Sequence, residues 1–158
     1  MSPNDSSNAS LQPDEVRERF FTAESANDAL VLVRPVVRDI VAAYNELMRL
    51  RTDQQELVLL ADAHARLDEL RAAIEQKVER LKRLVREIGE IGCELKDPSA
   101  GLVDFPALHD GRKVLLCWKL DEPEVAYWHE VHTGFAGRQP IDTEFRLRAG
   151  EPLPVRSE

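Results

Sequence analysis

The sequence predicts an α+β protein in which a long antiparallel two-helix, coiled-coil-like hairpin is followed by a small antiparallel β-meander. Two patterns of apolar spacing support this fold class. From Ala26 to Ile88, apolar residues recur at alternating steps of three and four, as they do along heptad helices. After Gly101 the step becomes two, which is typical of strands that bury one face.

The chain has 158 residues, enough for one domain with an ordinary core. We expect a disordered N-terminal tail over residues 1–19, because its start is polar and carries Pro, Asn and Ser. A single domain follows over 20–148, with the helical hairpin at 22–95 and a β-rich head at 101–148. Residues 149–158 are expected to form a flexible C-terminal tail.

Thr22 is the predicted N-cap of the first helix, with Glu24 and Ser25 in its first turn. Pro35 lies inside the apolar repeat, but the phase of the repeat continues across it. We therefore predict either one helix with a bend near residues 32–34 or two short helices in line. The apolar repeat consists of Ala26, Leu30, Val33, Val37, Ile40, Tyr44 and Leu47.

Asp53 and Glu56 form a capping-box pattern, which predicts that a second helix starts there and runs for about 35–40 residues. The short connection implies an antiparallel hairpin. His64 and Arg71 occupy seam positions, where they either fix register or lie past the seam and face water. Because two helices bury only one seam, the hairpin needs a third partner: the C-terminal segment, a second copy, or both.

The head is predicted to contain strands at 102–105, 112–120 and 124–131. Asp110-Gly111 is a strong signal for a hairpin turn between the first two. Within the second strand, Val114, Leu116 and Trp118 share one face, and Cys117 lies on the other. Residues 133–140 are expected to form a loop, and 143–148 a further short strand.

The composition excludes several classes of binding partner. The formal net charge is −8, which argues against sequence-independent nucleic-acid binding and against docking on anionic lipid. No apolar run approaches the about 20 residues of a membrane span, and nothing at the N-terminus resembles a signal peptide. Two cysteines cannot form a disulfide framework. We therefore expect a cytoplasmic protein with no membrane or nucleic-acid partner.

Four residues of the head are candidates for a ligand-binding site: Asp104, His129, Glu130 and Arg138, with Cys117 nearby. Carboxylates, imidazoles and thiolates are metal-ligating groups. Strand alternation places His129 and Glu130 on opposite faces, so both cannot ligate one ion without a bulge. We expect His129 to be an interior histidine bonded to a carboxylate such as Asp104, and we predict no metal, cofactor or catalytic residue.

The loop Gly134-Phe-Ala-Gly-Arg138 leaves two interpretations open. Its glycines could let backbone N–H groups approach an anion that Arg138 clamps. Alternatively, the glycines turn the chain, and Arg138 ties the loop to an internal Asp or Glu; a buried pair with Asp104 or Glu130 would satisfy both motifs at once. Cys117 with His129 as base is a poor nucleophile pair, because Cys117 sits in mid-strand between bulky neighbours. We interpret Cys117 as a small core side chain.

Several segments resemble an uncharacterised bacterial family, domain of unknown function 2203. They are FFTAESANDAL, LVRPVV, GLVDFP, LLCWKL, EPEVAYWHE and GFAGRQPI, and they cover roughly Phe20 to Ile141. The resemblance implies no activity that can be transferred. Ser25 departs from the pattern, since an acidic residue is expected after Glu24, and its presence should weaken the N-terminal capping box.

The sequence supports two hypotheses for the function of the protein. The favoured one is a non-enzymatic cytoplasmic interaction or structural protein that forms a homodimer through its heptad helices, with a further protein partner possible. The alternative is a metal- or small-anion-binding protein, conceivably an enzyme, with a site in the β-rich head.

Overall fold

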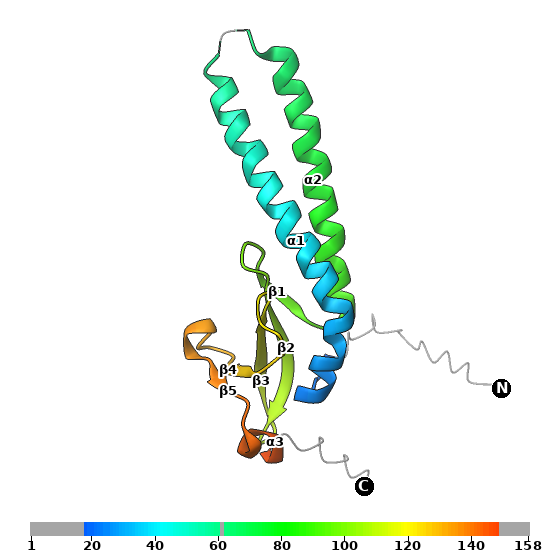
Figure 1. Ribbon diagram of the computed structural model, residues 1–158, viewed down its shortest axis with the longest axis vertical. Coiled ribbons are helices and arrows are strands. Elements are labelled where there is room, and N and C mark those ends of the chain that lie inside the picture. Colours follow the sequence, from blue (N-terminus) through cyan, green and yellow to red (C-terminus); the bar gives the residue numbers. More distant parts are fainter. Residues whose placement is uncertain (1–17, 61, 149–158) are drawn as a thin grey trace, which may run out of the picture.

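The computed structural model describes residues 18–60 and 62–148 and confirms the α+β fold class. Two long helices pack against each other and a five-stranded antiparallel sheet follows (Figure 1). The predicted tails lie outside the described residues, except for Glu18 and Arg19. Of these two, Glu18 forms an ion pair with Lys113, and the guanidinium of Arg19 stacks over Phe21.

Helix α1 (Ala23–Val58) is one continuous helix, and Pro35 lies within it. The alternative of two short helices in line is therefore wrong. Thr22 caps the helix as predicted, and its hydroxyl accepts a hydrogen bond from the Ser25 N–H at 3.0 Å. Ser25 Oγ accepts one from the Thr22 N–H at 2.8 Å, so Ser25 completes the capping box instead of weakening it.

Helix α2 (His64–Ile91) starts later than predicted, because the chain stays helical in α1 through Asp53 and Glu56 to Val58. The capping-box pattern at Asp53 was therefore misleading. His64 and Arg71 are exposed, which agrees with seam-edge positions that face water. The helix ends at Gly92, whose φ of 105° suits glycine.

The sheet runs in the order β1-β2-β3-β4-β5. Its centre is the hairpin of β2 (Leu102–His109) and β3 (Arg112–Lys119), joined by the predicted Asp110-Gly111 turn with φ values of 52° and 78°. The prediction for the next strand was too long, since β4 spans Tyr127–Glu130. Two short edge strands were not predicted: β1 (Glu94–Asp97) and β5 (Gln139–Pro140), which follows the 3-10 turn η1 (Phe135–Gly137).

The predicted last strand is instead a short helix, α3 (Thr143–Arg148). Asp142 accepts a hydrogen bond from the Phe145 N–H at 2.8 Å, as a helix-capping carboxylate does. Phe145 is buried, and its ring stacks on His109 with centroids 4.6 Å apart. The cap and this apolar anchor explain why the segment turns into a helix instead of extending the sheet.

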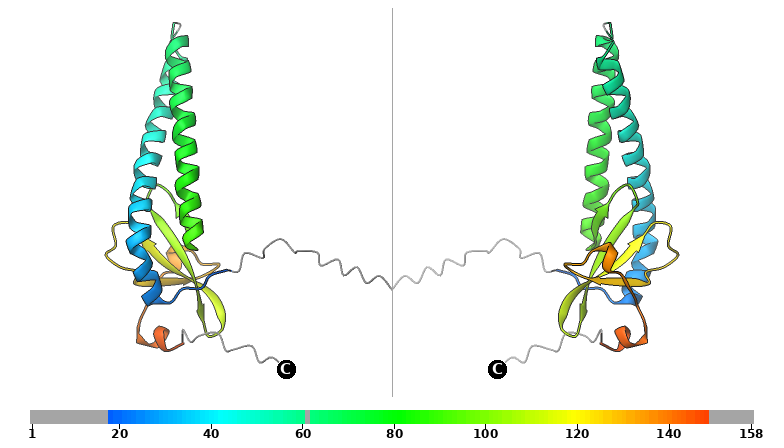
Figure 2. Two further views of the ribbon diagram at one scale, coloured as in Figure 1. Left: turned by 90° about the vertical axis from the view of Figure 1, so that its right-hand side faces the viewer. Right: turned by 90° about the vertical axis from the view of Figure 1, so that its left-hand side faces the viewer.

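The main core lies between one face of the sheet and the sheet-proximal half of the hairpin (Figure 2). Phe21 meets Phe105 edge to face at 5.2 Å, and Trp118 is fully buried. The rest of the hairpin extends beyond the sheet; we call residues 44–60 and 62–83 the arm (Figure 1). Among the described residues, no helix combines the length and apolarity needed to cross a bilayer.

Candidate functional site

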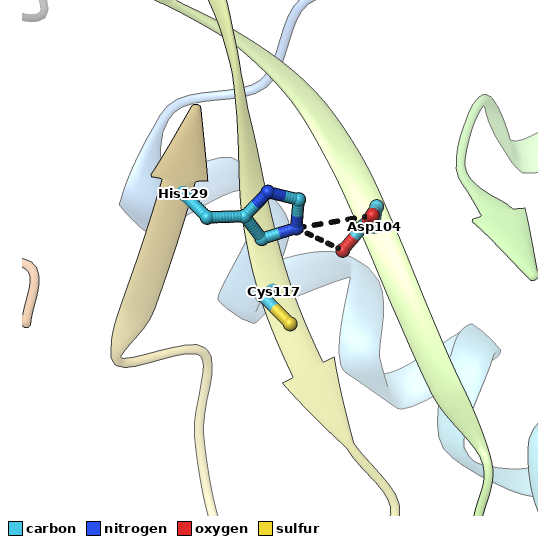
Figure 3. A group of neighbouring side chains, drawn as sticks. All are labelled: Asp104, Cys117 and His129. Carbon is cyan, nitrogen blue, oxygen red and sulfur yellow. Dashed lines mark hydrogen bonds and ion pairs between the residues drawn. The ribbon is translucent and has the colours of Figure 1, made fainter. Parts of the chain in front are cut away.

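Three neighbouring strands bring Asp104, Cys117 and His129 together on the sheet face opposite the helices (Figure 3). Asp104 of β2 lies directly across from Cys117 of β3, and His129 of β4 lies across from Leu115. Because side chains two residues apart share a face, His129 and Cys117 point to the same side. The register of the meander therefore builds the group from residues far apart in sequence.

His129 is the interior histidine that the sequence predicted. Its Nε2 lies 3.1 and 3.2 Å from the two carboxylate oxygens of Asp104, and both residues are 2% exposed. Its Nδ1 lies 2.7 Å from the backbone carbonyl oxygen of Glu130. A carbonyl oxygen only accepts, so Nδ1 carries a hydrogen, and Nε2 is the atom directed at Asp104.

Cys117 completes the group, since one ligand atom from each of the three residues lies within 4.8 Å of the others. Burial, together with the Asp104 carboxylate, raises the pKa of the Cys117 thiol to about 12, although Arg138 acts in the opposite direction. A thiol that stays protonated near neutral pH is a weak nucleophile, which agrees with its interpretation as a core side chain.

Glu130 does not join this group. It lies on the other face of the sheet, where its carboxylate forms an ion pair with Arg112. There it lines a small polar pocket together with His109 and Arg148. Nδ1 of His109 is buried and has no hydrogen-bond partner among the described residues. The sequence indicated this separation through strand alternation.

Arg138 ties the η1 loop to an internal Glu, as one of the two interpretations predicted, but this residue is Glu122. Its Nη2 donates to Glu122 Oε1 at 2.5 Å and to the Cys117 carbonyl oxygen at 3.1 Å, and neither Asp104 nor Glu130 is its partner. Its guanidinium also stacks over Tyr127 at 4.2 Å. Burial is the largest single effect and lowers the pKa of Arg138, but the hydrogen bond and charge of Glu122 together with the Cys117 contacts outweigh it, so the pKa of Arg138 is raised.

Glu122 was missed because it lies between the predicted strands 112–120 and 124–131, where an acidic side chain usually faces water. Its carboxylate also accepts from the Lys119 N–H at 2.8 Å, and this second contact holds it under the sheet edge. A pair of Arg138 and Glu122 that is mostly buried is electrically neutral. It therefore ties the loop to the sheet and adds no net charge beside the Asp104–Cys117–His129 group.

Chemically, the group offers one oxygen, one sulfur and one nitrogen donor on rigid strands. In the part of the chain that the structure describes, no other set of three such side chains comes this close together. The arrangement suits either a buried hydrogen-bonded pair beside a thiol or the coordination of a cation.

Comparison with known proteins gives a family but no activity. No curated protein matches the chain, and no solved structure matches it. A family model described as "Uncharacterized conserved protein (DUF2203)" matches residues 19–141, which span both helices, the five strands and the Asp104–Cys117–His129 group. The chain therefore belongs to the DUF2203 family of uncharacterised conserved proteins.

Proposed function

We propose that this protein is a non-enzymatic cytoplasmic interaction protein that self-associates through its arm. The observation that carries the proposal is the incomplete burial of the two-helix arm. Within His64–Ile91, only Leu84 and Ile88 are buried. Near the tip, Val58, Leu59 and Leu60 are 61%, 84% and 62% exposed. An apolar stripe of this kind gains stability when another surface covers it.

Two apolar grooves along the hairpin carry rims of opposite charge. The tip groove is floored by Leu57, Leu60 and Leu70, and its rim is mainly acidic. The base groove is floored by Leu47, Val78, Leu81 and Val85, and its rim is basic. The acidic rim consists of Asp53, Glu56 and Glu69 beside one Arg66, and the basic rim of Arg51, Lys82 and Arg86.

These rims favour a second copy of the chain as the occupant. The tip groove of one copy complements the base groove of another in both apolar character and charge. The arm as a whole is also neutral, with eight acidic and eight basic residues, although the chain carries a net charge of −8. Two arms can therefore approach without the repulsion that the rest of the chain would cause.

A charge-swap experiment tests this assignment. One variant carries Lys82→Glu with Arg86→Glu, which makes both rims acidic. The other carries Glu56→Lys with Glu69→Lys, which makes both rims basic. All four residues are exposed, so their replacement leaves the core intact. Sedimentation velocity at micromolar concentration and low salt measures the mass of the wild type, of each variant and of their equimolar mixture.

We expect the wild type to sediment above the monomer mass, each variant alone to be monomeric, and the mixture to recover association. Added salt should weaken the wild-type complex, because exposed charges are screened. A wild type that remains a compact monomer would refute the proposal. Association that survives in each variant alone would refute the role of the charged rims.

The alternative function, small-anion binding in the head, has weaker support. Arg138 already donates to Glu122 and to the Cys117 carbonyl oxygen, and aromatic rings cover its guanidinium. An anion would have to displace Glu122. A thermal-shift screen with phosphate, sulfate and carboxylates would support this alternative only if an anion stabilised the wild type and failed to stabilise Arg138→Lys.

A further inference from the structure

We propose that Asp104, Cys117 and His129 form a binding site for a zinc-type divalent cation, held by a carboxylate oxygen, the thiolate sulfur and the imidazole Nε2. This site is independent of self-association through the arm.

The first argument is the orientation of His129. Because Nδ1 donates to the Glu130 carbonyl oxygen at 2.7 Å, the neutral ring presents the lone pair of Nε2 to the Asp104 carboxylate. Two acceptors at 3.1 Å repel each other unless a proton or a metal cation lies between them. A backbone carbonyl that holds the distal ring nitrogen is also the usual way in which a metal-ligating histidine is fixed.

The second argument is Cys117. A histidine–aspartate ion pair needs no third donor, yet the thiol lies within the same 4.8 Å group and is fully buried. In a tetrahedral site with bonds of about 2.0–2.3 Å, ligand atoms lie roughly 3.3–3.8 Å apart. The group therefore needs to contract by about 1 Å, which side-chain rotation can provide while the strands stay in place.

The net charge of the occupied site also favours a divalent cation. A divalent cation with one thiolate, one carboxylate and one neutral imidazole is neutral overall. The nearby charged groups among the described residues are themselves paired: Arg138 with Glu122, and Glu94, which lies across from Asp104 in the sheet, with Lys96. A neutral assembly avoids the large desolvation cost of an isolated buried charge.

The oxygen, sulfur and nitrogen donors determine which metal ion the site should prefer. Sulfur and imidazole nitrogen suit Zn²⁺ and its spectroscopic substitute Co²⁺, whereas Mg²⁺ prefers oxygen ligands in octahedral geometry. Three protein ligands leave a fourth position for water, as in zinc sites that keep an open coordination position.

Titration of metal-free, untagged full-length protein with Co²⁺ gives a direct test, because a thiolate ligand produces a charge-transfer band in the near ultraviolet. We expect this band at one equivalent in the wild type, and its loss on addition of excess Zn²⁺ but not of Mg²⁺. Cys117→Ser should abolish the band. Cys93→Ser is the matched control, since Cys93 is the other buried free cysteine and belongs to no such group.

Stability provides the second readout. Zn²⁺ at 100 times its Kd should raise the melting temperature of the wild type by roughly 5–10 °C, and should leave His129→Gln unchanged. Absence of the band and of stabilisation in the wild type would overturn the proposal in favour of a protonated His129–Asp104 pair, whether or not the variants fold. A band that persists in Cys117→Ser would overturn it as well.

Discussion

Gly101 offers a test of how closely the head packs on α1. Its φ of 69° lies in the left-handed region, and it is buried where the chain enters β2. A Cβ atom there would lie 2.9 Å from Val37 Cγ1, 2.9 Å from Leu120 Cβ and 3.1 Å from Val41 Cγ2. Carbon atoms at optimal contact are about 3.5–4.0 Å apart, so Gly101→Ala combines backbone strain with steric overlap.

The two contributions can be estimated separately. A left-handed alanine costs about 1–2 kcal/mol, and overpacking a core site costs about 1–3 kcal/mol. Gly101→Ala should therefore lower the free energy of unfolding by about 2–5 kcal/mol. Gly111 is the control, because its φ is 78° but none of the described atoms beyond its chain neighbours lies within 4 Å of the added Cβ. Gly111→Ala should cost only the strain, about 1–2 kcal/mol.

Urea unfolding monitored by circular dichroism measures both variants against the wild type. Gly89→Ala provides an internal check of the opposite sign, since Gly89 lies within α2 and its Cβ meets no described atom within 4 Å. It should stabilise the protein by about 0.5–1 kcal/mol. Equal losses for Gly101→Ala and Gly111→Ala would show that the turn before β2 does not pack against α1 as described.

Three further predictions concern single side chains. Asn27→Ala should lower the free energy of unfolding, measured in urea, by about 2–3 kcal/mol. In the wild type the buried Val125 N–H donates to Asn27 Oδ1 at 2.7 Å, and the substitution leaves this N–H without a partner. A loss below about 0.5 kcal/mol would contradict this. Asp104→Ala should cost about 3–5 kcal/mol in the same assay, because it removes the buried partner of His129 Nε2, and Asp104→Asn should cost less, because an amide can still hydrogen-bond to that ring nitrogen; equal losses would show that Asp104 does not hold the imidazole. Both cysteines should resist Ellman's reagent at pH 8 until the chain unfolds, because burial raises the pKa of each thiol to about 12. Since unfolded thiols ionise near pH 8.5, stability should fall as the pH rises above about 8.5, and a double Cys→Ser variant should lose this dependence.

The candidate site was only partly predictable from the sequence. Strand alternation correctly separated His129 from Glu130, and the expectation of a carboxylate partner at Asp104 was confirmed. Cys117 was recognised as nearby, but its place beside Asp104 depends on the register of β2 against β3. An internal acidic partner for Arg138 was predicted, but Glu122 was not identified, because no local pattern shows which acidic residue the fold brings beside Arg138.

Local patterns were sufficient for the elements whose stability is local. Apolar periodicity predicted α1 and the main part of α2, and Asp110-Gly111 predicted the central hairpin, because these signals act within a few residues. Two other features depended on which of two local signals prevailed. Continuation of α1 prevailed over the capping-box pattern at Asp53, and the Asp142 cap with the buried Phe145 prevailed over strand propensity in residues 143–148. The grouping of Asp104, Cys117 and His129 arises only when strand register brings distant residues face to face, and that register is set by the burial of the opposite face against α1.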